Sequence, residues 1–183
     1  MHKFLSIAMS ISALLLTAFS NASAAEPDPP VLTITGEVSH PNRGALDPFH
    51  DAFLSHKDKT FTKAFAFTRS SLAGLPQIKI STNVETWPGK IELEGPRLVD
   101  ALAAAGVAAD ATIVATALDG YNVELTPETI SAHDWILAID AQGTPLSIGG
   151  RGPVWLIHGT DGKAVSQDVE ATWVWALYLL EVK

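Results

Sequence analysis

The stretch Asp134–Ile157, DWILAIDAQGTPLSIGGRGPVWLI, contains two apolar segments joined by a polar connection. The segments DWILAID and VWLI are short, and each has the length of a buried strand rather than of a helix. Between them, AQGTPL has the composition of a turn, and residues 149–153 place three glycines and a proline around Arg151. The stretch therefore predicts two buried strands, with a tight turn around a single cation between them.

The segments before this stretch predict further short strands, because apolar residues alternate or form short runs between turn signals. Phe65 and Phe67 are expected to share one strand face, and Ile78 and Ile80 are expected to point inward. The expected strands are VLTITGEV (31–38, ending at Gly36), FTKAFAF (61–67), QIKIST (77–82), TIVATAL (112–118) and YNVEL (121–125). Residues 39–59 and 83–90 are expected to be loops.

Three short helices have recognisable starts. Thr68 is expected to cap a single turn, TRSSLAGLP, that ends at its glycine and proline. The clearest helix is GPRLVDALAAAGV, with Pro96 in its first turn and Gly106 at its stop. A third helix is expected to begin at Thr126, with proline at its first position.

The C-terminal segment TWVWALYLLEV (172–182) is compatible with a long apolar strand or with a buried helix. Its alternation of large and small residues favours a strand, with Trp173 and Trp175 on one face. With about seven or more strands and two or three short helices, the chain is expected to fold as an α+β domain dominated by sheet.

Composition excludes several classes of function. The chain has 183 residues, which suits one domain, and a net charge of −8 at pH 7. An acidic chain of this kind is a poor partner for nucleic acids and for anionic membranes. The sequence contains no cysteine, which excludes disulfides, thiol nucleophiles and zinc–thiolate sites.

The first 24 residues have the features of a secretory signal peptide. Lys3 precedes the apolar run FLSIAMSISALLLTAF, and Ala22-Ser23-Ala24 supplies small residues for cleavage. A permanent membrane anchor is the alternative, but the run is shorter than a bilayer requires. We therefore expect a signal peptide at 1–24, an extended leader at 25–30 and a domain at 31–183. The expected location is periplasmic or secreted, through the general secretory route, with no stable membrane insertion after cleavage.

Seven segments occur in an order that resembles the molybdopterin-binding domain of sulfite-oxidase-type oxidoreductases, and in particular its small secreted single-domain members. These segments are LTITGEV, LAGLPQIKI, TWPG, LEGPRLVDALAAAGV, ATALDGY, ILAIDAQGTPLSIGGRGPVWLI and TWVWALYLLEV. The resemblance covers roughly Val31 to Val182. It implies a compact mixed α+β fold with several sheet layers.

The same resemblance implies where a cofactor would bind. In the enzymes of this family, a cysteine thiolate after the strand that matches PQIKI ligates molybdenum. The matching place in this chain is near Thr82 and Asn83, and no cysteine stands there or elsewhere. A hydroxyl or an amide does not replace a soft thiolate. We therefore expect no cofactor, and molybdopterin only if the family's function is retained.

Arg151 has two interpretations. It is the only Lys or Arg between Arg97 and Lys163, and the resemblance places its loop at the border of the pocket for the anionic pterin. A guanidinium beside glycine amides can hold an anionic group of a small ligand. Alternatively, the glycines only shape a turn, and Arg151 pairs with one of the many acidic residues.

The candidate ligand pocket contains five residues: Asn83, Thr86, Trp87, Tyr121 and Arg151. An alternative interpretation of Trp87 is a tryptophan that closes the edge of the core. An alternative interpretation of Tyr121 is a strand residue that packs on a neighbour. No catalytic residue is assigned, because the chain has no Gly-x-Ser-x-Gly, no His-Glu-x-x-His and no phosphate loop. Histidines and aspartates gather in the first long loop, but their spacing matches no metal-ligand motif, and we expect no metal site.

Three hypotheses for the function remain open. The first is a non-redox module that binds or senses a small, anionic ligand in the candidate pocket. The second is a molybdopterin-dependent oxidoreductase, so that the sequence leaves open whether the protein is an enzyme. The third is an interaction partner of an inner-membrane sensor or of another exported subunit, through an exposed apolar patch near Phe61, Phe65 and Phe67.

Overall fold

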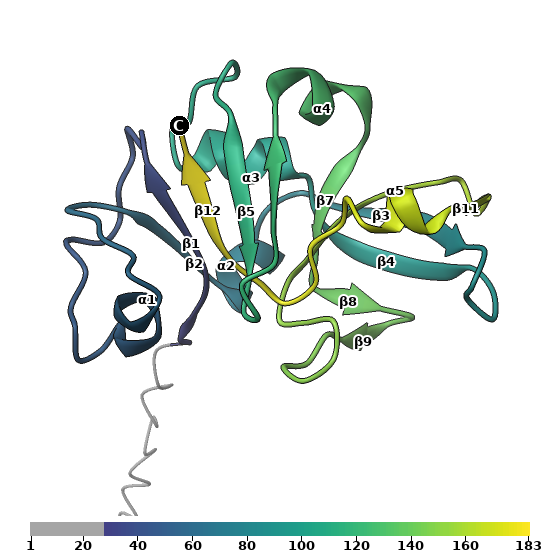
Figure 1. Cartoon of the computed structure of the whole chain (residues 1–183), viewed down its shortest axis with the longest axis horizontal. Helices are drawn as coiled ribbons and strands as arrows, with labels where there is room; N and C mark the ends of the chain where they lie inside the picture. The colour runs from purple at the N-terminus through teal and green to yellow at the C-terminus, as the bar shows by residue number, and fades with distance from the viewer. Residues whose placement is uncertain (1–27) are drawn as a thin grey trace, which may run out of the picture.

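The computed structural model describes residues 28–183 (Figure 1). The predicted signal peptide, residues 1–24, and residues 25–27 of the predicted leader lie outside the described residues. Within residues 28–183, no helix is both long enough and apolar enough to cross a bilayer. This part of the chain forms twelve strands and five short helices, which confirms the prediction of a strand-rich mixed domain.

The strands are β1 (Pro30–Gly36), β2 (Phe65–Thr68), β3 (Gln77–Val84), β4 (Ile91–Pro96), β5 (Ile113–Ala117), β6 (Asn122–Leu125), β7 (Trp135–Ala138), β8 (Asp140–Ala141), β9 (Thr144–Pro145), β10 (Trp155–His158), β11 (Ala164–Val165) and β12 (Leu177–Val182). The helices are α1 (Ala52–His56), α2 (Arg69–Ala73), α3 (Leu98–Ala104), α4 (Pro127–Ala132) and α5 (Gln167–Glu170).

The strands form three sheets. The first, on the left of Figure 1, has the order β2-β1-β12-β5-β6, and it places the first strand parallel to the last. The third, on the right, has the order β11-β3-β4-β8-β9. The second contains only β7 and β10, the two strands predicted from the stretch Asp134–Ile157, and they pair antiparallel.

The β7–β10 pair is buried on both faces, which explains why its two segments are apolar throughout. Every residue of both strands is buried. Gly95 in β4 lets the third sheet approach this pair closely, because a Cβ at this position would lie 2.1 Å from the carbonyl oxygen of Leu137. A side chain there would overlap backbone atoms, so the close approach requires glycine.

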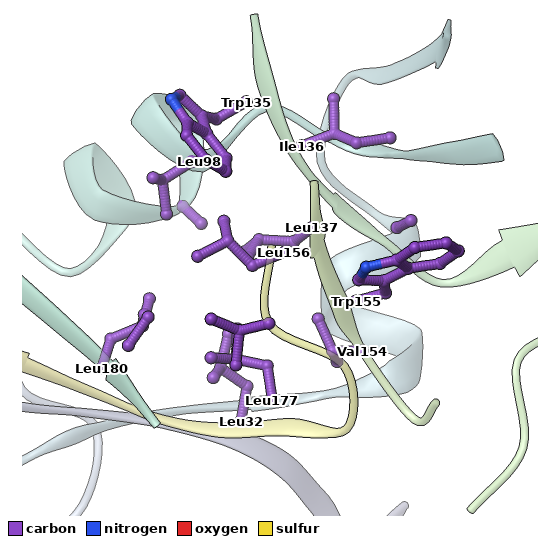
Figure 2. Close-up of a cluster of buried hydrophobic side chains, with 14 of the residues drawn as sticks. Leu32, Leu98, Trp135, Ile136, Leu137, Val154, Trp155, Leu156, Leu177 and Leu180 are labelled. Atoms are coloured by element: carbon purple, nitrogen blue, oxygen red, sulfur yellow. The ribbon is translucent and has the colours of Figure 1, made fainter. Parts of the chain in front are cut away.

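The hydrophobic core joins all of these layers. Figure 2 shows side chains of β7 and β10 in one cluster with Leu98 of α3, Leu32 of β1 and Leu180 of β12. Each of these three leucines is at most 1% exposed. Burying a leucine side chain stabilises the fold by about 1.5–3 kcal/mol. The β7–β10 pair and its connection are therefore fixed by the main core, and the turn around Arg151 starts from a rigid base.

The local signals for helix ends are in place. Thr68 caps α2, its hydroxyl accepting a hydrogen bond from the Ser71 N–H, and the Ser71 hydroxyl accepts one from the Thr68 N–H. Thr126 caps α4, with Pro127 at its first position. Gly106 follows α3 with a φ of +70°, as its place at the stop predicts.

Four expectations about the elements were wrong. The loop at 39–59 contains α1, and β3 runs past the expected end at Thr82 to Val84, so that Asn83 lies inside a strand. Pro96 ends β4 instead of opening α3, which begins after its N-cap Arg97. The C-terminal strand begins only at Leu177, so neither Trp173 nor Trp175 belongs to it. For β3, β4 and β12, pairing with strands far away in the sequence sets the boundary, and local pattern does not report such pairing.

Candidate functional site

Arg151 lies among three tryptophan rings that come from three different parts of the chain. Its guanidinium carbon is 5.1 Å from the ring centre of Trp87, 5.0 Å from that of Trp155 and 4.5 Å from that of Trp175. Trp155 belongs to β10, Trp87 follows β3, and Trp175 precedes β12. At these distances the cation is attracted to the negative faces of the rings.

Backbone hydrogen bonds bring these segments together. Val174 and Leu156 exchange two N–H···O bonds of 2.9 Å, which places the segment before β12 beside β10. The Ala176 N–H then donates to the Arg151 carbonyl oxygen at 2.9 Å. Gly152 is required for this path, because a Cβ there would lie 2.5 Å from the carbonyl carbon of Leu146. The glycines therefore have a structural role in holding Arg151 against the tryptophans.

The electrostatic surroundings of Arg151 are unusual for an arginine in an acidic protein. Among residues 28–183, no carboxylate lies within ion-pair distance of it. Its Nε–H is buried and has no hydrogen-bond partner in the same part of the chain. The acidic partner that the purely structural interpretation requires is thus not found within the described residues.

A cavity of about 330 Å³ lies beside Arg151. The β8–β9 hairpin and the glycine-rich turn form one wall, with the hydroxyls of Thr144 and Ser147, and Trp155 lines it as well. Most of the remaining lining is apolar, including Ile91 and Leu146. The cavity therefore combines one fixed cation with a mainly apolar lining, which is the usual composition of a small-molecule site.

Tyr121 lies in a different cavity, of about 360 Å³. The lining residues of this cavity include Asp119, Tyr121, Glu170, Trp173 and Trp175. The Tyr121 hydroxyl donates to the carbonyl oxygen of the residue after Glu170. Trp175 lines this cavity and also contacts Arg151, so both cavities border the same tryptophan cluster.

The five predicted pocket residues are therefore not all brought together. Trp87 and Arg151 are in contact, and Trp87 reaches the second cavity through a 3.1 Å hydrogen bond from its Nε1–H to Glu170 Oε1. Asn83 and Thr86 line neither cavity. The Asn83 side chain accepts a hydrogen bond from the next backbone N–H, and Thr86 is exposed in a turn.

Sequence reasoning did not identify the histidine pair next to the tryptophans. His158, at the end of β10, stacks on His133 with 4.1 Å between ring centres and 8° between planes. Trp135 and Trp173 meet His158 edge-on. Burial is the main cause that lowers the pKa of His158, and the charge of His133 adds to it, while a hydrogen bond to the Gly159 carbonyl opposes it. The signal available in the sequence was the position of His158 directly after the buried run VWLI.

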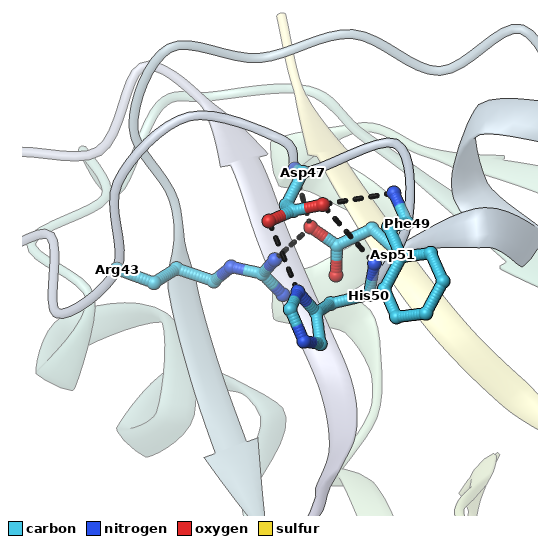
Figure 3. A network of polar contacts seen from close by, with 5 residues as sticks. All are labelled: Arg43, Asp47, Phe49, His50 and Asp51. Carbon is cyan, nitrogen blue, oxygen red and sulfur yellow. Dashed lines mark hydrogen bonds and ion pairs between the residues drawn. The ribbon is translucent and has the colours of Figure 1, made fainter.

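In the first loop, Arg43, Asp47, His50 and Asp51 form a network of ion pairs and hydrogen bonds (Figure 3). Arg43 pairs with Asp51 at 2.5 Å, and His50 Nδ1 lies 3.0 Å from Asp47 Oδ2. Hydrogen bonds from His50 and from the Phe49 N–H lower the pKa of Asp47 to about 2, and Asp47 raises the pKa of His50. Within residues 28–183, no group of three His, Cys, Asp or Glu is arranged to hold a metal ion.

The apolar patch expected near Phe61, Phe65 and Phe67 is not a continuous exposed surface. Phe67 is only 2% exposed, and Phe65 is half-buried against it, with 4.7 Å between their ring centres. Strand β2 pairs with β1, so one face of β2 contributes to the core. The alternating phenylalanines thus reflect packing against the core. The large apolar side chains that are exposed lie elsewhere, at Phe49 and Ile148 among others.

The residues present do not fit a molybdenum centre held by a protein thiolate. The position that the resemblance matches to the ligating cysteine is near Thr82, which is fully buried inside β3 and has a hydroxyl without a partner among residues 28–183. No thiolate exists in the sequence, and hydroxyl and amide groups are poor ligands for a soft metal site.

Comparison with known proteins supports the fold and nothing more specific. No family model and no curated protein matches the chain. Among solved structures, the chain is similar to the sulfane dehydrogenase SoxCD from Paracoccus pantotrophus, with a TM-score of 0.53 and 19% identity. The match covers 82% of this chain but only 37% of the other, so this chain spans little more than a third of that protein's length. The similarity supports the sulfite-oxidase-type α+β fold that the sequence resemblance predicted.

Proposed function

We propose that this protein is an exported, non-redox module that binds or senses a small organic anion at Arg151 and uses no molybdenum. The observation that carries the proposal is the state of Arg151. Its guanidinium is held by three indole rings and borders a cavity, and within residues 28–183 its side chain has no acidic partner.

The arrangement favours an anion with an apolar body. A guanidinium can present two parallel N–H donors to a carboxylate, a sulfonate or a phosphate. Contact with the rings of Trp87, Trp155 and Trp175 holds the group in place before the ligand arrives, which reduces the entropy lost on binding. The apolar lining of the cavity, with Ile91 and Leu146, suits the remainder of such a ligand.

The alternative of a molybdopterin-dependent oxidoreductase receives less support from the residues. The chain lacks the thiolate that ligates molybdenum in the family it resembles, and Thr82, at the matching position, is buried. Arg151 is also the only basic residue of the second half that borders this cavity. A pterin with a pyrophosphate would need several cations in its binding site.

The proposal is tested by screening small carboxylates, sulfonates and phosphates for an increase in Tm, in wild type and in Arg151→Met. Binding raises Tm only when the folded state binds the anion better than the unfolded state does. We expect at least one anion to stabilise wild type and to lose its effect in the variant. Arg97→Met is the matched control, because Arg97 is an exposed arginine that pairs with Asp134. Equal effects of every anion on wild type and Arg151→Met would contradict the proposal.

A further inference from the structure

The cavity that contains Tyr121 differs in charge from the one beside Arg151. It lies between the β5–β6 turn, helix α5 and the segment that leads into β12. Two carboxylates, those of Asp119 and Glu170, are among its lining residues, and no lysine or arginine is. A cavity with this lining would repel the anion proposed for Arg151 and attract a cation.

Aromatic rings form the other walls of this cavity. Tyr121 is 46% exposed and Trp175 is 42% exposed, which is unusual for side chains of this size, and both line the cavity together with the buried Trp173. Tyrosine and tryptophan rings attract ammonium groups through their negative faces. Aromatic walls combined with carboxylates form the arrangement that recognises organic ammonium ions.

The carboxylates are held in place before any ligand binds. Asp119 Oδ1 accepts the Tyr121 N–H at 2.8 Å, and Glu170 Oε1 accepts the Trp87 Nε1–H at 3.1 Å. Each bond uses one carboxylate oxygen and leaves the other for a ligand. The Tyr121 hydroxyl is bound to the carbonyl oxygen of Ala171, which fixes the ring.

Trp173 contributes its ring to the cavity wall, and its indole nitrogen is covered by the protein. Trp173 is 2% exposed, and its indole N–H is buried without an acceptor among residues 28–183. The groups that a ligand in the cavity can reach are therefore the carboxylates and the aromatic rings. This set of groups complements an organic ammonium ion.

The guanidinium of Arg151 does not cancel this preference. It lies 4.5 Å from the ring centre of Trp175, but Arg151 is not among the residues that line the cavity. The lining of the cavity therefore carries two negative charges, and the one positive charge nearby does not belong to the lining. We infer that this cavity is a second binding site, for a small organic ammonium ion. This inference does not rest on the anion site.

Choline is the probe for this site, because it is a small organic ammonium ion. Its matched control is 3,3-dimethyl-1-butanol, which has the same shape and hydroxyl but no charge. Isothermal titration calorimetry and tryptophan fluorescence on the purified protein would measure both. We expect choline to bind at least about tenfold more tightly than the neutral isostere. Equal affinities, or no binding of choline up to about 10 mM, would overturn the inference.

Two variants connect binding to the cavity. Glu170→Gln removes one charge and keeps an acceptor for the Trp87 N–H, and Tyr121→Leu removes one aromatic wall. We expect each to weaken choline binding by about tenfold. Asp168→Asn is the matched control, since Asp168 is an exposed acid of the same helix α5 that does not line the cavity. If Asp168→Asn weakened binding as much as Glu170→Gln, choline would be held by general surface charge, and the inference would be overturned.

Discussion

Arg151→Met tests whether stacking on three tryptophans is what holds the arginine. Methionine keeps most of the aliphatic stem and removes the guanidinium, so three cation–π contacts of 4.5–5.1 Å are lost. At about 0.5–1 kcal/mol for each such contact, the loss amounts to about 1.5–3 kcal/mol. Arg151 is half-buried, and the variant no longer has to bury a charge. We therefore expect a net decrease of about 1–2 kcal/mol in the free energy of unfolding.

Urea denaturation followed by tryptophan fluorescence measures this change. With a slope of about 2 kcal/mol per molar urea, the midpoint should fall by about 0.5–1 M. Arg97→Met should shift the free energy of unfolding by less than about 0.5 kcal/mol, because its ion pair with Asp134 is largely exposed. An Arg151→Met protein as stable as wild type would refute the stacking argument, and with it the reason for a preoriented guanidinium.

Three further predictions concern the fold and its pH dependence. Gly95→Ala should lower the free energy of unfolding by at least about 1–3 kcal/mol, because the new Cβ would meet the Leu137 carbonyl. Gly89→Ala is the control, because the new Cβ there has open space around it. Equal urea midpoints for the two variants would contradict the close approach of β4 to β7. His158 has a lowered pKa in the folded state, so below about pH 6.5 the unfolded chain takes up a proton first and stability falls as pH decreases. His158→Gln should therefore lose less stability between pH 7 and 5 than wild type, and parallel pH profiles would show that the histidine pair is not responsible. Arg69→Met should lower the free energy of unfolding by about 1–3 kcal/mol, because Arg69 donates to the Ile139 carbonyl at 2.7 Å and to both oxygens of Asp140. Lys79→Met is the control, because it breaks only an exposed 3.5 Å pair with Glu94 and should change the free energy of unfolding little. An equally small effect of both variants would contradict a structural role for Arg69.

The elements that sequence predicted well are those whose signals are local. The cap at Thr68, the proline after Thr126 and the glycine at 106 each act within one turn of chain, and each lies where the pattern placed it. The prediction of strands at β7 and β10 was also correct. A strand that is buried on both faces is apolar throughout, and this pattern is visible in the sequence without knowledge of the partner strand.

Strand β4 shows what local pattern could not predict. No strand was expected at Ile91–Pro96, yet Glu92 and Glu94 alternate there with Ile91 and with Leu93, which is only 1% exposed. The strand exists because it pairs with both β3 and β8, and β3 likewise continues past Thr82 because Asn83 and Val84 pair with β11. Long-range pairing of this kind has no counterpart in a short window of sequence.

The candidate site was predicted in part, for a similar reason. Trp87 and Arg151 are 64 positions apart in the sequence and are in contact in the structure. Asn83 was included because the resemblance matches its place to the ligating cysteine, and Thr86 because it is a neighbour of Trp87. Neighbouring residues of a strand and turn point in different directions, so these two side chains do not join the cluster. Trp175 was placed on one strand face with Trp173, whereas a turn at Ala176, with a φ of +47°, ends that segment before β12 begins.

The central claim is that the chain keeps a sulfite-oxidase-type fold without molybdenum chemistry. The most direct test is native mass spectrometry of the protein, purified after export by its own signal. A denatured control and elemental analysis for molybdenum would accompany it. We predict no molybdenum, and either the bare chain or a chain with a small metal-free ligand that denaturation releases. A mass excess of a pterin cofactor together with about one molybdenum per chain would contradict the claim and establish the oxidoreductase.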